Sequence, residues 1–404
     1  MAGFDVKIKI KMKYNKSQIT MLMIVGLALF IIVSLVLYLS KSAVKKQSQQ
    51  YIKKTQEIVI EPQPIKEFVT KCLDKLAKDA LVLLGQQGGY IYTSQGGALV
   101  DYTNTDEELF FVKHNGLNIA YNILPPRFSV LAYSSYVPDY PWQTFPYKTE
   151  TSNAEIFEGF FGISTMPPLN SSGGPNSIQF QIETFIDNNM QSCLDINIFE
   201  KQGFEVVMQQ SKTSVIIGSD NVNIKSKIPI TITNPATNEF AEFNDFSSNI
   251  NIRLRDFYFF IRGLIENDIK NIMFDIANVN NSKDSIKIKI IRDVFSNNDL
   301  IIVTDEKSLV SGKPYEYIFA RRNRAPTLYY IKKNTISFPQ DYEITQSDLL
   351  QNSTLKAYDP DEDNYTFDIT PQLPKVLNVP QIKFKVGVSD GKLSDYQFIT
   401  VNRE

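Results

Sequence analysis

The 404-residue chain is long enough for about two or three domains, and 43% hydrophobic with 12% aromatic residues is the composition of a folded protein. Its formal charge of −2 is unevenly distributed, because residues 1–46 contain eight lysines and one aspartate while the remainder carries −9. An acidic body with one histidine and two cysteines argues against a nucleic-acid-binding surface and against a zinc site built on histidine and cysteine.

Residues 19–39 form an uncharged run of 21 residues. A helix of this length spans about 30 Å, the thickness of the hydrocarbon core of a bilayer. The run is longer than the apolar region of a secretory leader, which has about 7 to 15 residues. It predicts one transmembrane helix, with residues 1–18 as a basic cytoplasmic tail beside the lipid headgroups and residues 40–63 as a connector.

Lysines flank this run equally on both sides, so its orientation depends on other features. The lysines before the run are more densely clustered, and the residues after it include a cysteine pair with no third thiol. Four Asn-x-Ser/Thr sequons also follow the run, at Asn170, Asn280, Asn352 and Asn364. Together these features predict a single-pass protein of the cell membrane with the bulk of its chain extracytoplasmic.

The sequence KSQIT before the apolar run offers an alternative. It resembles the leader of archaeal pilins, which implies cleavage by a membrane peptidase between Ser17 and Gln18 and a helix that packs in a fibre core. Such leaders have Gly or Ala where this chain has Ser17, and Leu22 stands where many bacterial pilins have Glu. A retained anchor is therefore the interpretation that we favour over a filament subunit.

An amphipathic helix is predicted next, with Pro64 in its first turn and Gly85 as its C-terminal cap. Its apolar stripe consists of Ile65, Phe68, Val69, Cys72, Leu73, Leu76, Ala80 and Leu84. Residues 90–175 are rich in Tyr, Pro, Phe and Gly, which predicts long loops pinned to a core. Within them, His114 lies in the turn-like sequence VKHNGL and is interpreted as a solvated loop histidine and not as a catalytic one.

A second helix is predicted in SIQFQIETFIDNNMQSCLDINIF, where Cys193 lies on the apolar stripe as Cys72 does on the first helix. In an oxidising compartment the two cysteines would form a disulfide that closes a loop of about 120 residues and contributes roughly 5 kcal/mol. Otherwise they would be two small buried hydrophobic residues. We expect the disulfide.

Alternating apolar residues on either side of the turn Gly218-Ser219-Asp220-Asn221 predict a β-hairpin. A long helix is predicted over residues 248–276, because apolar residues recur at helical spacing from Ile250 to Ile276. Strands in IKIKII, LIIVTD and SLVSGKPYEYIFARRN then complete an α+β ectodomain over residues 64–322.

Four pieces follow one another behind the hydrophobic segment: IKEFVTKCLDKLAKDALVLLGQQGGYI, MQSCLDINIFEKQGFEV, IIGSDNVNIKSKIPITI and KPYEYIFARRNRAP. In this order they resemble membrane-anchored surface proteins of archaea, over roughly two thirds of the chain. The resemblance implies a cell-surface location and a pairing of Cys72 with Cys193, and it implies no activity.

From Asn323 the sequence changes to short alternating strands. The segments AYDPDEDNYTFDIT and IKFKVGVSDGKLSDYQFITV, the second around a hairpin turn at Asp390-Gly391, resemble those of cadherin-like and immunoglobulin-like modules. The resemblance implies an all-β sandwich over residues 323–404.

Acidic turns of related modules bind calcium, a hard cation that prefers oxygen ligands. Asp359, Asp361 and Asp363 occupy alternate positions in such a turn, and Asp390 would join them if the fold brings the two turns together. A solvated acidic turn is the alternative, because the loop lacks the Gly and Glu of an EF-hand.

These features predict a non-enzymatic, single-pass cell-surface protein that presents an adhesion or assembly module outside the membrane. Its expected partners are membrane lipid and a second copy, another surface protein or a glycan, and not nucleic acid. A filament or envelope subunit is the first alternative. An extracytoplasmic hydrolase is less favoured, because no spacing of carboxylates singles out a catalytic pair.

Overall fold

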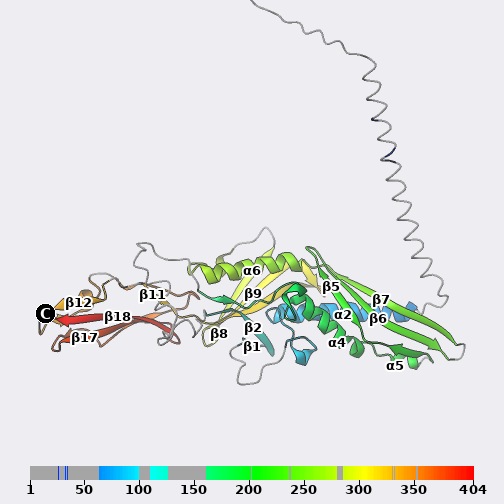
Figure 1. Cartoon of the computed structure of the whole chain (residues 1–404), viewed down its shortest axis with the longest axis horizontal. Coiled ribbons are helices and arrows are strands. Elements are labelled where there is room, and N and C mark those ends of the chain that lie inside the picture. Colours follow the sequence, from blue (N-terminus) through cyan, green and yellow to red (C-terminus); the bar gives the residue numbers. More distant parts are fainter. Residues whose placement is uncertain are drawn as a thin grey trace, which may run out of the picture. The chain divides into compact units, whose positions relative to one another are not determined.

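The computed structural model of the chain (Figure 1) describes Gly26, Ile32 and Ser34, which are helical, and residues 63–99, 110–125, 161–201, 203–235, 238–279, 285–329, 331, 333–351 and 354–404. Within these ranges, no helix is both long and apolar enough to cross a bilayer. The rest of the predicted membrane helix over 19–39 lies outside the described residues, as do the cytoplasmic tail with Ser17 and Gln18 and nearly all of the connector.

The described residues from Gln63 to Glu404 form one compact unit with a mixed α+β fold. Its helices and 3-10 turns are α2 (Gln63–Gln86), η1 (Thr93–Gln95), η4 (Ser171–Gly173), α4 (Ile178–Cys193), α5 (Asn197–Glu200), α6 (Leu254–Lys270), η5 (Ile276–Asn278) and α7 (Gln346–Leu349). Its strands are β1 (Phe111–His114), β2 (Leu117–Leu124), β3 (Ile163–Ser164), β4 (Glu205–Met208), β5 (Lys212–Ile217), β6 (Val222–Asn234), β7 (Glu239–Ile250), β8 (Ile286–Phe295), β9 (Asn298–Val310), β10 (Lys313–Arg321), β11 (Thr327–Leu328), β12 (Thr335–Phe338), β13 (Glu343–Ile344), β14 (Ala357–Tyr358), β15 (Thr366–Thr370), β16 (Lys375–Val376), β17 (Gln381–Ser389) and β18 (Ser394–Arg403).

Helix α2 forms where the apolar stripe predicts it and buries that stripe in the main core. The predicted cap at Gly85 is wrong, because the helix continues to Gln86 and the left-handed residues are Gly88 and Gly89 in the following turn. Gly85 is needed for a different reason: a Cβ there would overlap the backbone oxygen of Glu316 on β10. The glycine therefore allows the helix to approach the sheet closely.

The disulfide between Cys72 and Cys193 joins α2 to the last residue of α4. The two Cα atoms are 6.0 Å apart, and 121 residues separate the cysteines in sequence. The structure therefore confirms the predicted pairing and places it in the main core, where Cys72 is buried.

The predicted hairpin is also confirmed, since β5 and β6 pair antiparallel around residues 218–221. Strand β6 also pairs with β4 and β7, and one face of this sheet packs on α2 and α4 (Figure 1). The predicted helix over 248–276 is wrong at both ends, because Ile250 ends β7 and Ile276 begins η5, outside α6. Phe246, Ser248 and Ile250 alternate with exposed residues, so this stretch has the period of a strand.

A second sheet has the strand order β1-β2-β10-β9-β8, with β3 paired to β2. Strands β8, β9 and β10 form an antiparallel meander, which confirms the three strands that the sequence predicts there. Strand β2 lies parallel to β10, so the loop-rich first part of the chain and the end of the meander share one sheet.

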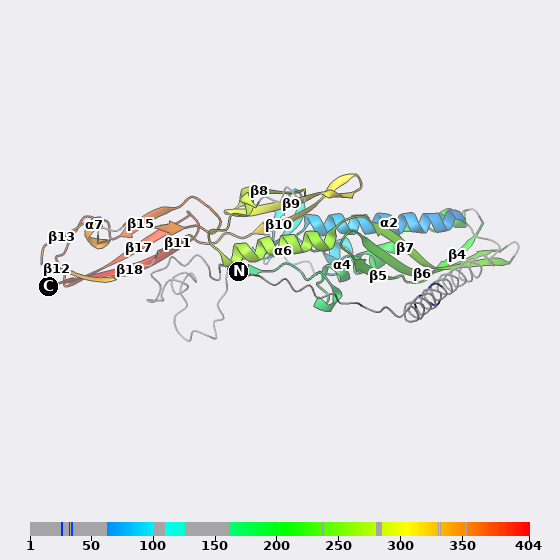
Figure 2. The same ribbon diagram turned by 90° about the horizontal axis from the view of Figure 1, so that it is seen from above.

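The C-terminal sheet region contains the four-stranded sheet β12-β18-β17-β15 and two short pairs, β11-β14 and β13-β16 (Figure 2). The predicted hairpin around Asp390-Gly391 is confirmed as β17 and β18. The region has a hydrophobic core of its own, formed by Leu328, Ile344, Leu349, Leu350, Ala357, Leu377, Phe384, Val386, Val388, Ile399 and Val401.

Candidate functional site

A buried network of two arginines and three aspartates lies where β10 leads into the C-terminal sheet region. Arg321 at the end of β10 contacts Asp268 of α6 at 3.0 Å and Asp299 of β9 at 2.7 Å. Arg324, which is fully buried, donates to Asp361 of the acidic turn from Nε at 2.9 Å and from Nη2 at 2.7 Å. The network thus links α6 and β9 to the C-terminal region through charge-assisted hydrogen bonds.

Burial by itself would lower the pKa of Arg321, but the carboxylates of Asp361, Asp268 and Asp299 outweigh it and raise that pKa above its usual value. Both arginines are therefore charged at every accessible pH. Asp361 also accepts a hydrogen bond from the backbone N–H of Arg324 at 2.6 Å. The structure thus places Asp361 among the arginines and not with the other predicted calcium ligands.

The other three predicted ligands do come together. Carboxylate oxygens of Asp359, Asp363 and Asp390 all lie within 4.8 Å of one another. Asp359 Oδ1 stabilises the turn, because it accepts hydrogen bonds from the backbone N–H groups of Asp361, at 2.8 Å, and Asp363, at 3.1 Å. Asp390 Oδ1 shapes the β17–β18 turn in the same way, by accepting from two backbone N–H groups at 2.6 Å each.

Three oxygen atoms at this cluster are buried and have no hydrogen-bond partner among the residues that the structure describes: Asp359 Oδ2, Asp363 Oδ2 and the amide oxygen of Asn323. Asp359 and Asn323 are only 7% and 5% exposed. The amide nitrogen of Asn323 donates to Asp390 Oδ2 at 2.7 Å, which puts this side chain beside the carboxylates. A buried oxygen that accepts no hydrogen bond lowers the stability of the fold. A bound cation would remove this cost, because it accepts the lone pairs of such oxygens.

The pKa values of two of these aspartates also indicate that their negative charges are poorly compensated. Burial, aided by the neighbouring carboxylate of Asp361, raises the pKa of Asp359 to about 8. Burial, together with the charges of Asp361, Asp299 and Asp390, raises the pKa of Asp363 to about 6. The carboxylates therefore favour either protons or a cation at this position.

The donor set fits calcium. Two oxygens bound to one calcium ion at about 2.4 Å lie at most about 4.8 Å apart, which is the span of this cluster. The three carboxylates, with the amide group of Asn323 beside them, offer at least four of the about six to eight oxygen ligands that calcium prefers. When bound, the ion would neutralise the excess of carboxylates over arginines where β10 leads into the C-terminal sheet region, a place that we call the junction.

The remaining candidate residues take no part in this site. His114 ends β1 in a tight hairpin and is half-buried. Among the residues that the structure describes, the three aspartates are the one group of histidine, cysteine and acidic side chains arranged to hold a metal. Asn323 and the two arginines were not predicted; the sequence RRNRAP shows a cluster of cations at the boundary, but it does not show that they lie close to the acidic turn.

No protein-family model matches the chain, and no curated protein matches it. The resemblance to membrane-anchored surface proteins of archaea, and that of residues 323–404 to cadherin-like and immunoglobulin-like modules, therefore stay predictions.

Proposed function

We propose that the chain is a non-enzymatic, single-pass cell-surface protein whose residues 323–404 form a cadherin-like or immunoglobulin-like sandwich used for adhesion or assembly. The separate core of the C-terminal region supports an independent module, and the paired β17 and β18 support its sheet. In this proposal calcium binds Asp359, Asp363 and Asp390 and stiffens the junction that carries the module.

The observation that carries this proposal is the charged junction itself. Neighbouring domains in one chain move relative to each other unless their interface is extensive. Here Arg321 and Arg324 bind aspartates on both sides of the junction. The carboxylate oxygens of the three aspartates that do not bind these arginines lie close enough together to bind one cation. A module held in a fixed direction by its junction suits the presentation of a binding surface away from a membrane.

The extracytoplasmic location is supported by the disulfide. Disulfides persist in oxidising compartments and are rare in reducing ones. The pairing of Cys72 with Cys193 is therefore the expected state of a chain whose folded part lies outside the membrane. Protease added to intact cells should cleave the folded part, and full protection of it would contradict this topology.

Calcium titration of the full chain in a non-ionic detergent tests the junction. We expect saturable heat, with a Kd of about 10⁻⁴ to 10⁻³ M as in extracellular modules, and a rise in Tm. Both should be lost in an Asp359→Asn/Asp363→Asn variant and kept in Asp368→Asn, which changes an exposed aspartate on β15. Absence of heat and of any Tm shift in the unmodified chain would refute the calcium site.

A filament or envelope subunit is the second candidate, favoured by KSQIT before the apolar run. The N-terminal residue of the mature protein decides between the two. A sequence that begins at Gln18 supports the filament subunit, whereas one that begins at Met1 or Ala2 supports the retained anchor.

A further inference from the structure

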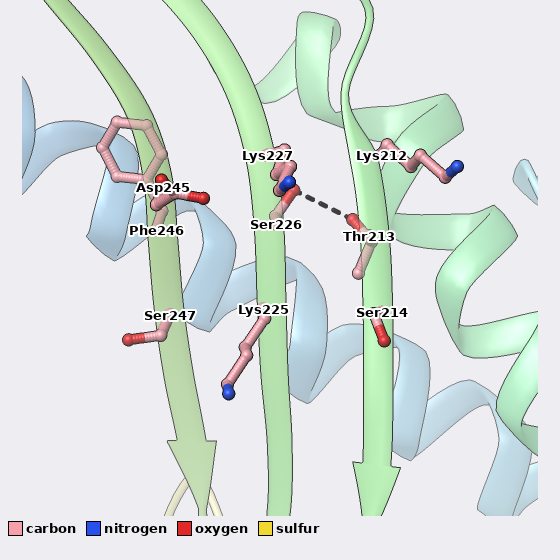
Figure 3. Close-up of a pocket in the computed structure, with 9 residues that line it drawn as sticks. All are labelled: Lys212, Thr213, Ser214, Lys225, Ser226, Lys227, Asp245, Phe246 and Ser247. Carbon is pink, nitrogen blue, oxygen red and sulfur yellow. Dashed lines mark hydrogen bonds between the residues drawn. The ribbon is translucent and has the colours of Figure 1, made fainter.

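A groove crosses the outer face of the sheet formed by β5, β6 and β7 (Figure 3). Its volume is about 510 Å³, which is within the range of about 300–1,000 Å³ typical of ligand sites. It is lined by Lys212, Thr213, Ser214, Lys225, Ser226, Lys227, Asp245, Phe246 and Ser247. The groove is remote in sequence from the acidic junction and uses none of its residues.

The strand register explains the shape of the groove. The middle row of residues, Thr213, Ser226 and Phe246, points into the core and is at least 93% buried, so that only the backbone of this row forms the floor. The two flanking rows point outward and are exposed. Rows two residues apart on a strand are about 7 Å apart, and they form the two walls.

The first wall consists of Lys212, Lys227 and Asp245, which lie directly opposite one another on the three strands. The second consists of Ser214, Lys225 and Ser247, with two small hydroxyl side chains on either side of the lysine. Long side chains thus stand beside short ones, and the short ones leave room for a ligand.

Lysines outnumber acidic residues among the residues that line the groove. Lys212 and Lys227 are a cross-strand pair of like charge, which is unfavourable for sheet stability. In the described part of the chain, none of the three lysines lies within 4.0 Å of a carboxylate, whereas Lys75 and Lys287 do form such pairs. Among the described residues, the groove therefore has three lysines and one aspartate, an excess of positive charge on a protein whose body is acidic.

Hydrogen bonds hold the strands that form the floor of the groove. The hydroxyl groups of Thr213 and Ser226 hydrogen-bond to each other at 3.0 Å. Asp187 of α4 accepts from the hydroxyl of Thr213 at 2.7 Å and from its backbone N–H at 3.1 Å. These contacts fix β5 against the helix beneath it, so the lysines project from a preorganised frame and binding needs little ordering of the backbone.

We propose that this groove binds an acidic glycan. The lysines fit the carboxylates of such a chain, while Ser214, Ser247 and Asp245 fit its hydroxyl groups. Asp245 favours a ligand that offers hydroxyl donors beside its acidic groups, as a sugar acid does, because an ionised carboxylate can only accept hydrogen bonds. The biological setting rests on the extracytoplasmic location proposed above, whereas the binding itself does not.

The test is the binding of tetragalacturonic acid to the full chain in non-ionic detergent, with calcium removed because uronates chelate it. We expect saturable binding that weakens as salt rises, and no binding of the neutral maltotetraose. A Lys212→Gln/Lys225→Gln/Lys227→Gln variant should bind at least about tenfold more weakly, a loss of about 1.4 kcal/mol. A Lys201→Gln/Lys313→Gln/Lys375→Gln variant, which removes three exposed lysines elsewhere, should bind normally.

No saturable binding by the unmodified chain, or equal binding by both triple variants, would overturn the proposal. A second arm, in which phosphatidylserine is added to the same detergent micelles, separates a lipid from a glycan. Binding of phosphatidylserine that depends on the groove lysines, without binding of tetragalacturonic acid, would assign the groove to lipid headgroups and would also overturn the proposal. Because calcium is absent throughout, failure here leaves the junction proposal unaffected.

Discussion

Asp361 balances both buried arginines of the junction. Its carboxylate lies 3.0 Å from Arg321 and 2.7 Å from Arg324, and all three side chains are at most 3% exposed. In Asp361→Asn the arginines would stay buried with less opposing charge, which typically costs about 3–5 kcal/mol. We expect a loss of this size in the free energy of unfolding, measured by urea denaturation of the full chain in detergent.

The neighbouring Glu362 provides the matched control. It pairs with Arg292 at the surface, where their side chains are 42% and 38% exposed. Because solvent screens such a pair, Glu362→Gln should cost no more than about 1 kcal/mol. Equal losses for the two variants would mean that the buried network does not hold the junction.

Two helical glycines with different surroundings make a second prediction. A Cβ at Gly85 would overlap the backbone of β10, whereas in the described part of the chain no atom beyond the backbone of α6 itself lies within 4 Å of a Cβ at Gly263. Gly263→Ala should therefore stabilise the chain by roughly 0.5–1 kcal/mol, because alanine favours helix. Gly85→Ala should destabilise it, since the helix or β10 must move; an unchanged Tm would show that α2 does not depend on this close approach.

The limits of sequence reasoning are clear at the site. Spacing alone grouped Asp359, Asp361 and Asp363, because alternate residues of a turn look equivalent in sequence. Only the fold separates them, by bringing Arg321 and Arg324 to Asp361. That separation depends on contacts between residues about 37 to 40 positions apart, which no local pattern encodes.

At the scale of elements, the disulfide holds two helices that pack on the same sheet. Closing a loop of 121 residues should contribute about 5 kcal/mol on the chain-entropy model. Replacing Cys72 and Cys193 by serine should lower the free energy of unfolding by an amount up to this value. Intact mass under denaturing conditions should rise by about two hydrogens on reduction, and no rise would contradict the pairing.

The elements that were predicted correctly from the sequence are those whose apolar residues recur with a single period, either helical or alternating. Helix α2 and the two hairpins have an unbroken stripe or alternation next to a turn with Gly or Asn. Strand β7 was taken in part for a helix, because its Ser248 and Ile250 precede the true helical stripe of α6 at a compatible spacing. Strands β2 and β10 meet only through tertiary pairing, so their shared sheet was not predictable.

At the scale of the whole folded unit, the junction lies between two hydrophobic cores, and a small apolar cluster that includes Phe161, Ile272 and Ala325 contains residues from both sides of it. Its polar network contributes orientation more than stability, since buried ion pairs barely repay their desolvation. A cation at Asp359, Asp363 and Asp390 would add the charge that the two arginines do not supply. The direction of the C-terminal region is then linked to calcium and to pH.

This linkage predicts how stability depends on pH. The pKa values of Asp359 and Asp363 are raised to about 8 and about 6, whereas unfolded aspartates titrate near about 3.9. Between these values the folded chain holds more protons than the unfolded one, so without calcium its stability should fall as pH rises from about 4 to about 8. Asp395, whose pKa burial raises to about 7, adds to the same fall.

Calcium binds the deprotonated carboxylates, so the rise in Tm that it causes should be small at about pH 5 and largest at about pH 8. The measurement is Tm of the full chain at both values, with chelator and with calcium. Asp359→Asn/Asp363→Asn should flatten the fall seen with chelator, leaving the part due to Asp395, and should abolish the calcium effect. If the calcium shift were the same at both pH values, the ion would bind elsewhere than at these two carboxylates.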